Sequence, residues 1–200
     1  MLRPTREIGT HRRYLVELFS SLWLPILAAS VALWIYGALA WMVLPQHKKD
    51  FKRLPDDDKV LDLVRSLNLP PGTYGYPNFV SHSEAQKPEM KAKFEKGPMG
   101  VLSVWKTPNM GINMALNFVF YVVACFLIAY LAAAAGVPRG AGFGKVMQVV
   151  GTAGVLAFSF SAIPGMIWFQ ANKPAIASHI FDGVVMGLIT GAVFALLWPK

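Results

Sequence analysis

Beside the apolar stretches of this sequence stand two histidines, an aspartate and two methionines whose side chains could do chemistry. They are His47, Met110, Met114, His179 and Asp182. Imidazole and thioether side chains together suit copper, and the two methionines stand one helical turn apart. The five residues are nevertheless scattered along the chain, and methionine usually fills gaps in apolar cores. We therefore favour membrane-boundary filler over a metal site and expect no cofactor.

The last two of these residues have a simpler interpretation. Asp182 directly precedes Gly183, and both stand near the start of the last apolar stretch, with His179 just before them. Aspartate is a preferred residue at the first position of a helix, where its side chain accepts a backbone hydrogen bond. The sequence thus predicts that Asp182 caps a helix that begins near Ile180.

Signatures of common catalytic chemistry are missing from the sequence. It contains no Walker loop, no dinucleotide-binding glycine fingerprint, no His-Glu-x-x-His and no Gly-x-Ser-x-Gly. The net charge of +8 comes from cations that flank the apolar stretches. Such cations meet anionic lipid headgroups, and no interleaving of aromatic and basic residues suggests nucleic acid.

Four apolar stretches must position the candidate residues. They lie near 22–44, 111–135, 146–169 and 180–198, and each is close to or above the roughly 20 residues that cross a bilayer as a helix. With 54% hydrophobic and 15% charged residues, the chain fits the membrane class. We predict an all-α membrane protein, a four-transmembrane-helix bundle with a small α+β extramembrane insert between helices 1 and 2. The predicted parts are a basic tail (1–20), helix 1 (21–46), the insert (47–110) and helices 2–4 (111–200).

The insert has its own pattern. Pro55 followed by three aspartates predicts a helix start, and apolar residues at helical spacing continue it to about Asn68. A short extended piece should follow at 73–77, then a helix opened by Pro88 and a strand at 100–105. So few residues bury little core, so we expect this insert to lean on the bilayer surface or on another subunit.

The last apolar stretch carries a row of small residues at intervals of four: Gly183, Gly187, Gly191 and Ala195. Small residues let helix backbones approach closely in lipid. The row predicts a close helix contact, with an internal partner favoured over a second protein. Weaker rows are Ala157, Ser161 and Gly165 in the third stretch and Cys125, Ala129 and Ala133 in the second.

Pro164 should bend or end the third helix. A broken helix that lines a transporter site is one interpretation. A kink that accommodates the following loop is the other, and we favour it.

An even number of spans places both termini on one side of the membrane. More Lys and Arg residues flank the spans on the insert side than on the terminal side, and such residues concentrate in the cytoplasm. The arginines of the N-terminal tail argue for the reverse orientation. We predict a multi-pass protein of the cell (inner) membrane with a cytoplasmic insert.

Several short motifs resemble those of small uncharacterised bacterial membrane proteins. They are Leu24-Pro-Ile-Leu, Met42-Val-Leu-Pro-Gln-His47, Lys52-Arg-Leu-Pro55, Leu69-Pro-Pro-Gly, Gly97-Pro-Met-Gly and Leu196-Leu-Trp-Pro199. The resemblance covers the chain from about residue 21 onward. It implies a four-span architecture and a bacterial origin, and it assigns no activity and no site residue.

Three function classes follow from these observations. The leading prediction is a non-catalytic integral membrane protein, a small accessory or stabilising subunit of a larger membrane complex. The alternative is a small oligomeric transporter or channel, and the third is a membrane enzyme or metal-handling protein. The expected partners are the lipid bilayer and other membrane subunits or a second copy of the chain, and not nucleic acid.

Overall fold

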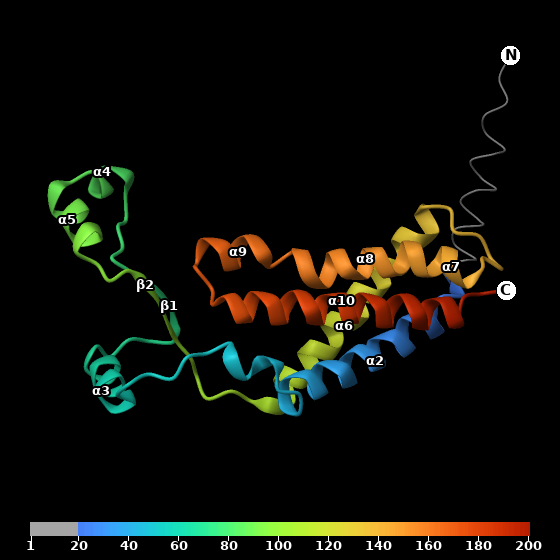
Figure 1. Ribbon diagram of the computed structural model, residues 1–200, viewed down its shortest axis with the longest axis horizontal. Coiled ribbons are helices and arrows are strands. Elements are labelled where there is room, and N and C mark those ends of the chain that lie inside the picture. Colours follow the sequence, from blue (N-terminus) through green and yellow to red (C-terminus); the bar gives the residue numbers. More distant parts are fainter. Residues whose placement is uncertain (1–19) are drawn as a thin grey trace, which may run out of the picture. The chain divides into compact units, whose positions relative to one another are not determined.

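The computed structural model describes residues 20–200, which form two compact units. The first unit combines the residues up to Phe51 with Met110–Lys200, and the second is Lys52–Asn109. Four helices of the first unit are long and apolar enough to cross a membrane, as the sequence predicted. They are α2 (Trp23–Met42), α6 (Met110–Ala134), the helix Phe143–Trp168, and α10 (Lys173–Leu196) (Figure 1).

The helix Phe143–Trp168, called the third helix below, is not uniform. It contains α7 (Phe143–Val146), the π-helical turn η2 (Met147–Gly151), α8 (Thr152–Val155), a second π-helical turn η3 (Leu156–Phe160) and α9 (Ile163–Trp168). A turn at Ser161 separates η3 from α9, and Pro164 lies in the first turn of α9. Proline is tolerated there because the backbone N–H group that it lacks would have no helical partner. The third helix is thus interrupted just before Pro164, where the sequence predicted a bend or an end.

The last helix begins earlier than the sequence predicted. It starts at Lys173, with Pro174 in its first turn, and not near Ile180. The physical reason is that proline pre-forms the first helical turn, whereas the prediction followed hydropathy and so left out the polar opening of the helix.

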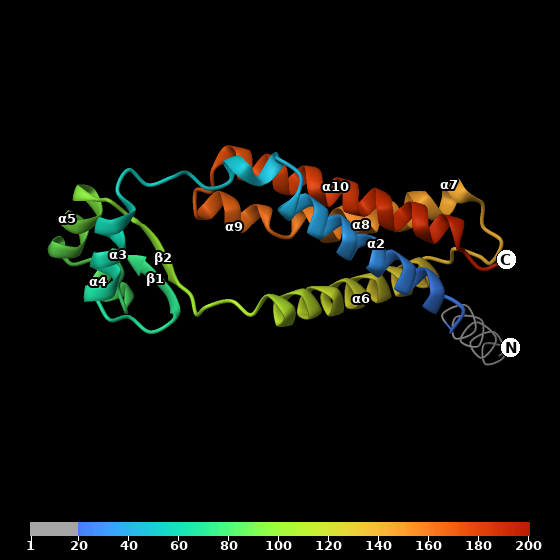
Figure 2. The same ribbon diagram turned by 90° about the horizontal axis from the view of Figure 1, so that it is seen from below.

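Helix α10 is central to the first unit. It packs against α2 on one side and the third helix on the other, and α6 packs against α2 (Figures 1 and 2). Contact between α6 and the third helix is concentrated at η2. The short 3-10 helix η1 (Gln46–Lys49) follows α2 and contacts α10, so this end of the unit brings together segments distant in sequence.

The glycine row of α10 faces the third helix. A Cβ atom at Gly187 would lie 2.5 Å from the backbone nitrogen of Val155, and one at Gly191 would lie 2.8 Å from the Cα of Gly151. Gly183 faces the backbone of Ser159 in the same way. The close helix contact is therefore internal to the chain.

The face that the third helix offers to these glycines is formed by Met147, Gly151, Val155 and Ser159. The weaker row of small residues noted in the sequence, Ala157, Ser161 and Gly165, is not among these contacts. Each π-helical turn holds more residues than an α-helical turn and so rotates the face that follows it. In the second apolar stretch, the row Cys125, Ala129 and Ala133 is buried.

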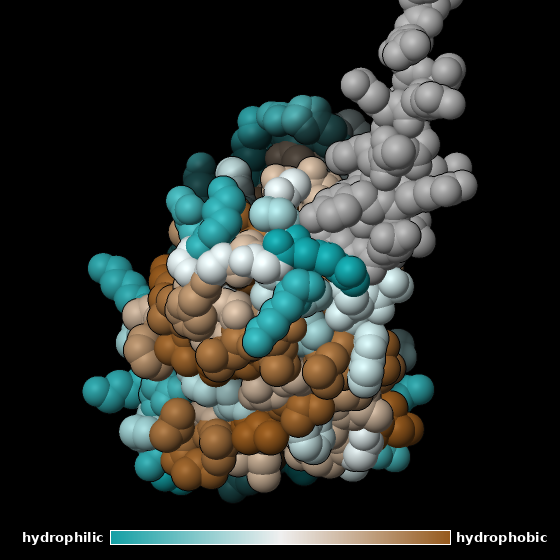
Figure 3. Space-filling view, turned by 90° about the vertical axis from the view of Figure 1, so that its right-hand side faces the viewer, coloured by the Kyte–Doolittle hydropathy of each residue, from teal (hydrophilic) through white to brown (hydrophobic). Residues whose placement is uncertain are grey.

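The outward faces of the helices are apolar. On α2, Leu24, Leu27, Val31, Ile35 and Leu39 form an exposed row, each with 43% to 49% of its surface accessible. Exposed leucines, phenylalanines and valines continue this character on α6 and α10. Hydrophobic side chains also make up much of the surface in Figure 3.

The second unit is small and thinly packed. Its elements are α3 (Asp57–Ser66), β1 (Gly72–Tyr76), α4 (His82–Ala85), α5 (Pro88–Lys96) and β2 (Gly100–Val104). The strands pair antiparallel, with Gly72 opposite Val104 and Tyr76 opposite Gly100. The order helix, strand, helix, strand matches the prediction, with α4 as an addition. Within Lys52–Asn109, Met90 is the one buried hydrophobic side chain.

Candidate functional site

A buried carboxylate lies at the centre of the candidate site. Asp182 is 7% exposed and stands nine residues after the start of α10 at Lys173. The predicted capping role is therefore wrong, because the helix is already in its third turn at this point. Asp182 is held by other segments instead. Its Oδ1 accepts hydrogen bonds from the Tyr36 hydroxyl at 2.7 Å and from Gln46 Nε2 at 3.1 Å.

His47 connects this carboxylate to a second one. Its Nε2 lies 2.6 Å from Asp182 Oδ2, and its Nδ1 lies 2.6 Å from Asp50 Oδ2. The side chains of all three residues are less than 10% exposed. A neutral imidazole has one N–H group, whereas the imidazolium has two, so it is the protonated form of His47 that can donate hydrogen bonds to both carboxylates at once. Such charge-assisted hydrogen bonds offset the cost of burying the charges.

The electrostatics of His47 favour this charged form. Burial lowers its pKa, but the hydrogen bonds to Asp50 and Asp182 raise it by more, so the pKa of His47 lies above its ordinary value. The Trp41 ring also stacks on the imidazole, with centroids 4.0 Å apart and planes 6° from parallel. An aromatic face stabilises an adjacent cation.

The local sequence explains how η1 reaches α10. The residue before a proline is disfavoured in a helix, and α2 ends before Pro45. The chain then turns through η1, which two side chains of the α10 end hold in place. Ser178 Oγ donates to the Gln46 carbonyl at 3.0 Å, and Asn172 Nδ2 donates to the Lys49 carbonyl at 3.1 Å.

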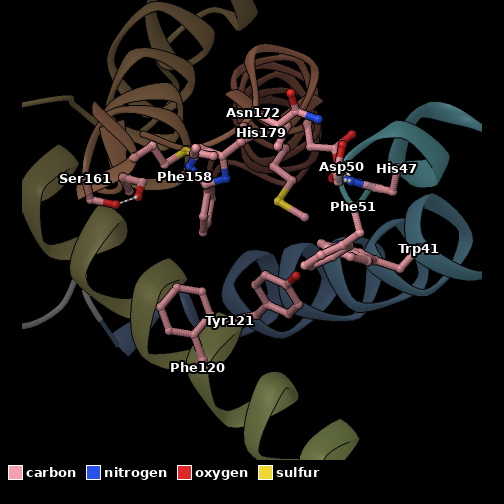
Figure 4. Close-up of a pocket in the computed structure, with 17 residues that line it drawn as sticks. Trp41, His47, Asp50, Phe51, Phe120, Tyr121, Phe158, Ser161, Asn172 and His179 are labelled. Atoms are coloured by element: carbon pink, nitrogen blue, oxygen red, sulfur yellow. Dashed lines mark hydrogen bonds and ion pairs between the residues drawn. The ribbon is translucent and has the colours of Figure 1, made fainter. Parts of the chain in front are cut away.

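A cavity of about 550 Å³ lies beside this cluster (Figure 4). Its walls are largely aromatic or apolar and include Trp41, Phe51, Phe120, Tyr121 and Phe158. Its polar lining comprises His47, Asp50, Ser161, Asn172, His179 and Asp182. Lys and Arg are absent from this lining as far as residues 20–200 are concerned. The cavity therefore has apolar walls and an acidic polar end.

Two lining residues have a buried polar atom without a hydrogen-bond partner. Among the described residues, Asp50 Oδ1 and His179 Nε2 are the side-chain atoms in this condition. Most buried polar atoms in proteins are hydrogen-bonded, and leaving one unpaired is unfavourable. Both atoms are enclosed by protein atoms, so they do not face the cavity that other atoms of Asp50 and His179 line.

The structure brings together three of the five residues named as a candidate metal site. His47 and Asp182 are in contact, and His179 lines the same cavity. Met110 and Met114 do not line it. Met110 is exposed, and the Met114 carbonyl accepts a hydrogen bond from the Trp34 indole at 3.0 Å. Between residues 20 and 200, no group of three or more His, Cys, Asp or Glu side chains has the arrangement of a metal site.

Sequence reasoning missed three members of the site. Asp50 carried a signal, because it stands three residues after His47 and such spacing allows contact in a helical turn. Tyr36 and Gln46 carried none, since their contacts with Asp182 join residues more than 130 positions apart.

The arrangement can bind and orient a polar group at one end of an apolar chamber. Comparison with known proteins adds no precedent for it. No protein-family model, curated protein or solved structure matches this chain.

Proposed function

We propose that the chain is a multi-pass integral membrane protein that holds a small amphipathic molecule in the cavity beside His47, without catalysing a reaction on it. The observation that carries this proposal is the cavity of about 550 Å³, whose walls are largely aromatic or apolar and whose polar lining includes the cluster of His47, Asp50 and Asp182. A ligand with one polar group and an apolar body matches such a chamber.

Membrane insertion is supported by the four helices and by their outward faces. Exposed apolar rows such as Leu24 to Leu39 on α2 would be unfavourable in water, whereas their contact with lipid is favourable. An ionisable residue within such a helix is rare and marks a functional position by default. Asp182 is such a residue in α10.

Photoaffinity labelling of the full chain, purified in mild detergent, tests the proposal. The probe is dodecanol with a diazirine in its chain, and the labelled residues are mapped by peptide mass spectrometry. We expect saturable labelling of peptides that line the cavity. Ser161→Trp should reduce it, because the larger side chain fills the chamber that Ser161 lines. Tyr130→Trp, on an exposed part of α6 that does not line the cavity, is the matched control. Labelling that never saturates, or that is equal in both variants, would contradict the proposal.

A second candidate function is that of an accessory subunit, which the Lys52–Asn109 unit favours. Met90 is its one buried hydrophobic side chain, while Val80 is 97% and Trp105 is 78% exposed. A small unit that buries so little apolar surface gains stability from a partner that covers its exposed apolar side chains. We propose that a partner membrane subunit covers this surface. A photocrosslinking amino acid at Val80 should trap one specific protein in native membranes, whereas the same residue at exposed Lys91 should not.

A further inference from the structure

The beginning of α6 is packed on one side only. The Trp34 indole of α2 donates to the Met114 carbonyl at 3.0 Å, and the Trp34 ring lies edge-on to Phe118. Met114 and Phe118 are half-buried, whereas the other residues of 110–119 are exposed. Leu116 lies about 160° around the helix from both of them. It therefore points away from α2, and this part of α6 also lies apart from the third helix (Figures 1 and 2).

Two asparagines flank Leu116 on the side turned away from α2. Asn113, Leu116 and Asn117 have the spacing i, i+3, i+4, which places side chains on one side of a helix. All three are exposed, Leu116 to 62%. The Asn117 amide forms a hydrogen bond with the Tyr121 hydroxyl, which uses one of the several hydrogen-bonding positions of a carboxamide. A helix otherwise suited to lipid thus exposes polar groups here.

The depth of Asn117 makes this exposure unfavourable in a bilayer. Asn117 stands seven residues after the start of α6 at Met110, about 10 Å along the axis at 1.5 Å per residue. The 25 residues of α6 span about 37 Å, which exceeds the hydrocarbon core by about 7 Å. Even if all of this excess lies at the Met110 end, Asn117 is inside the core. Lipid offers no hydrogen bonds there, so the carboxamide needs a protein partner.

A second copy of the chain supplies a matching group. A carboxamide both donates and accepts hydrogen bonds, so two asparagine side chains can satisfy each other, as they do in parallel coiled coils. Copies inserted in the same orientation form a dimer whose two-fold axis runs along the membrane normal. Two α6 helices related by that axis are parallel, so each residue meets its counterpart at the same depth.

We propose that two copies of this chain dimerise through the beginning of α6, with Asn113, Leu116 and Asn117 of each copy packed against the same residues of the other. The two asparagines form interhelical hydrogen bonds, and Leu116 fills the space between them. This inference rests on the membrane insertion proposed above and is independent of the cavity ligand.

Cysteine cross-linking of the full chain in native membranes tests the contact. Asn113→Cys should give a disulfide-linked dimer on oxidation with copper phenanthroline. Ala115→Cys is the matched control, because Ala115 is exposed on α6 about 160° around the helix from both asparagines. The wild type should not cross-link, since Cys125 is buried. Absence of the dimer, equal cross-linking of the two variants, or cross-linking of Asn113→Cys to a different protein would overturn the proposal.

An alkaline carbonate wash separates this failure from failure of the proposed function. A chain that stays in the membrane without cross-linking would overturn the dimer alone. A chain that the wash removes would overturn membrane insertion as well.

Dilution of fluorescently labelled chains in lipid vesicles measures the hydrogen bonds, with energy transfer reporting the dimer. Asn117→Leu should raise the dissociation constant about three-fold or more. Asn117→Gln keeps the carboxamide and should retain most of the association. Thr152→Leu removes an exposed polar group from the third helix and should change nothing. An unchanged dissociation constant in Asn117→Leu, or an equal loss in Asn117→Gln or Thr152→Leu, would overturn the hydrogen-bonded contact.

Discussion

A methyl group added at Gly187 should destabilise the first unit, although alanine is the better helix former. The added Cβ would lie 2.5 Å from the backbone nitrogen of Val155 and 2.9 Å from its Cα. Backbone atoms cannot rotate aside, so α10 and the third helix would have to separate. Overpacking of this kind costs about 1–3 kcal/mol. Replacing a helical glycine with alanine returns about 0.5–1 kcal/mol, so the overpacking term outweighs the gain.

Gly165→Ala is the matched control, because it makes the same chemical change without the contact. Gly165 lies inside α9, and a Cβ there would meet no atom within 4 Å. The control should therefore keep the gain from helix propensity and leave the protein unchanged or slightly more stable. In the same detergent, Gly187→Ala should lower the midpoint of thermal unfolding, whereas Gly165→Ala should leave it unchanged or raise it slightly. A Gly187→Ala protein that melts at or above the wild-type temperature would refute the close contact.

Three further outcomes are expected. Because the pKa of His47 is raised above its ordinary value of 6.5, its contribution to stability is complete below about pH 6.5 and is lost as the pH rises through the folded-state value. From about pH 6.5 upward, the melting temperature of His47→Gln should therefore fall less with pH than that of the wild type. An equally steep fall in the variant would point to another group. Labelling with a membrane-impermeant reagent should find Lys93 and Lys200 on opposite faces of the membrane, and labelling of both from one side would refute the topology. Metal analysis should find no stoichiometric copper or zinc in the wild type or in the His47→Gln, His179→Gln double variant, and metal lost on double substitution would establish a metal site.

The elements of the fold were largely predictable, because each depends on local chemistry. Pro88 opens α5 and Gly97 follows its end, as the sequence predicted from the preferences of proline and glycine. The four long helices followed from hydropathy alone. The predicted start of α10 was wrong because polar residues at a helix end lower the hydropathy without ending the helix.

The site was less predictable, because it depends on contacts between distant segments. Asp182 was correctly singled out as polar in an apolar stretch, but no local pattern places Tyr36 against it. The residues of the third helix that contact the α10 glycines were not predicted, for a related reason. Which side chains face α10 depends on the π-helical turns η2 and η3, and regular α-helical spacing does not predict such turns.

The position of Asp182 also has a consequence for biosynthesis. In the membrane protein proposed above, α10 is made after the other three spans, and an aspartate deep in a transmembrane helix costs about 2.5–3.5 kcal/mol to insert. Its partners Tyr36 and His47 are synthesised before α10, so they are already present when the carboxylate leaves the ribosome. Insertion of α10 therefore depends on a helix completed more than a hundred residues earlier. Because these partners are made first, the Asp182 carboxylate can form hydrogen bonds that lipid does not provide.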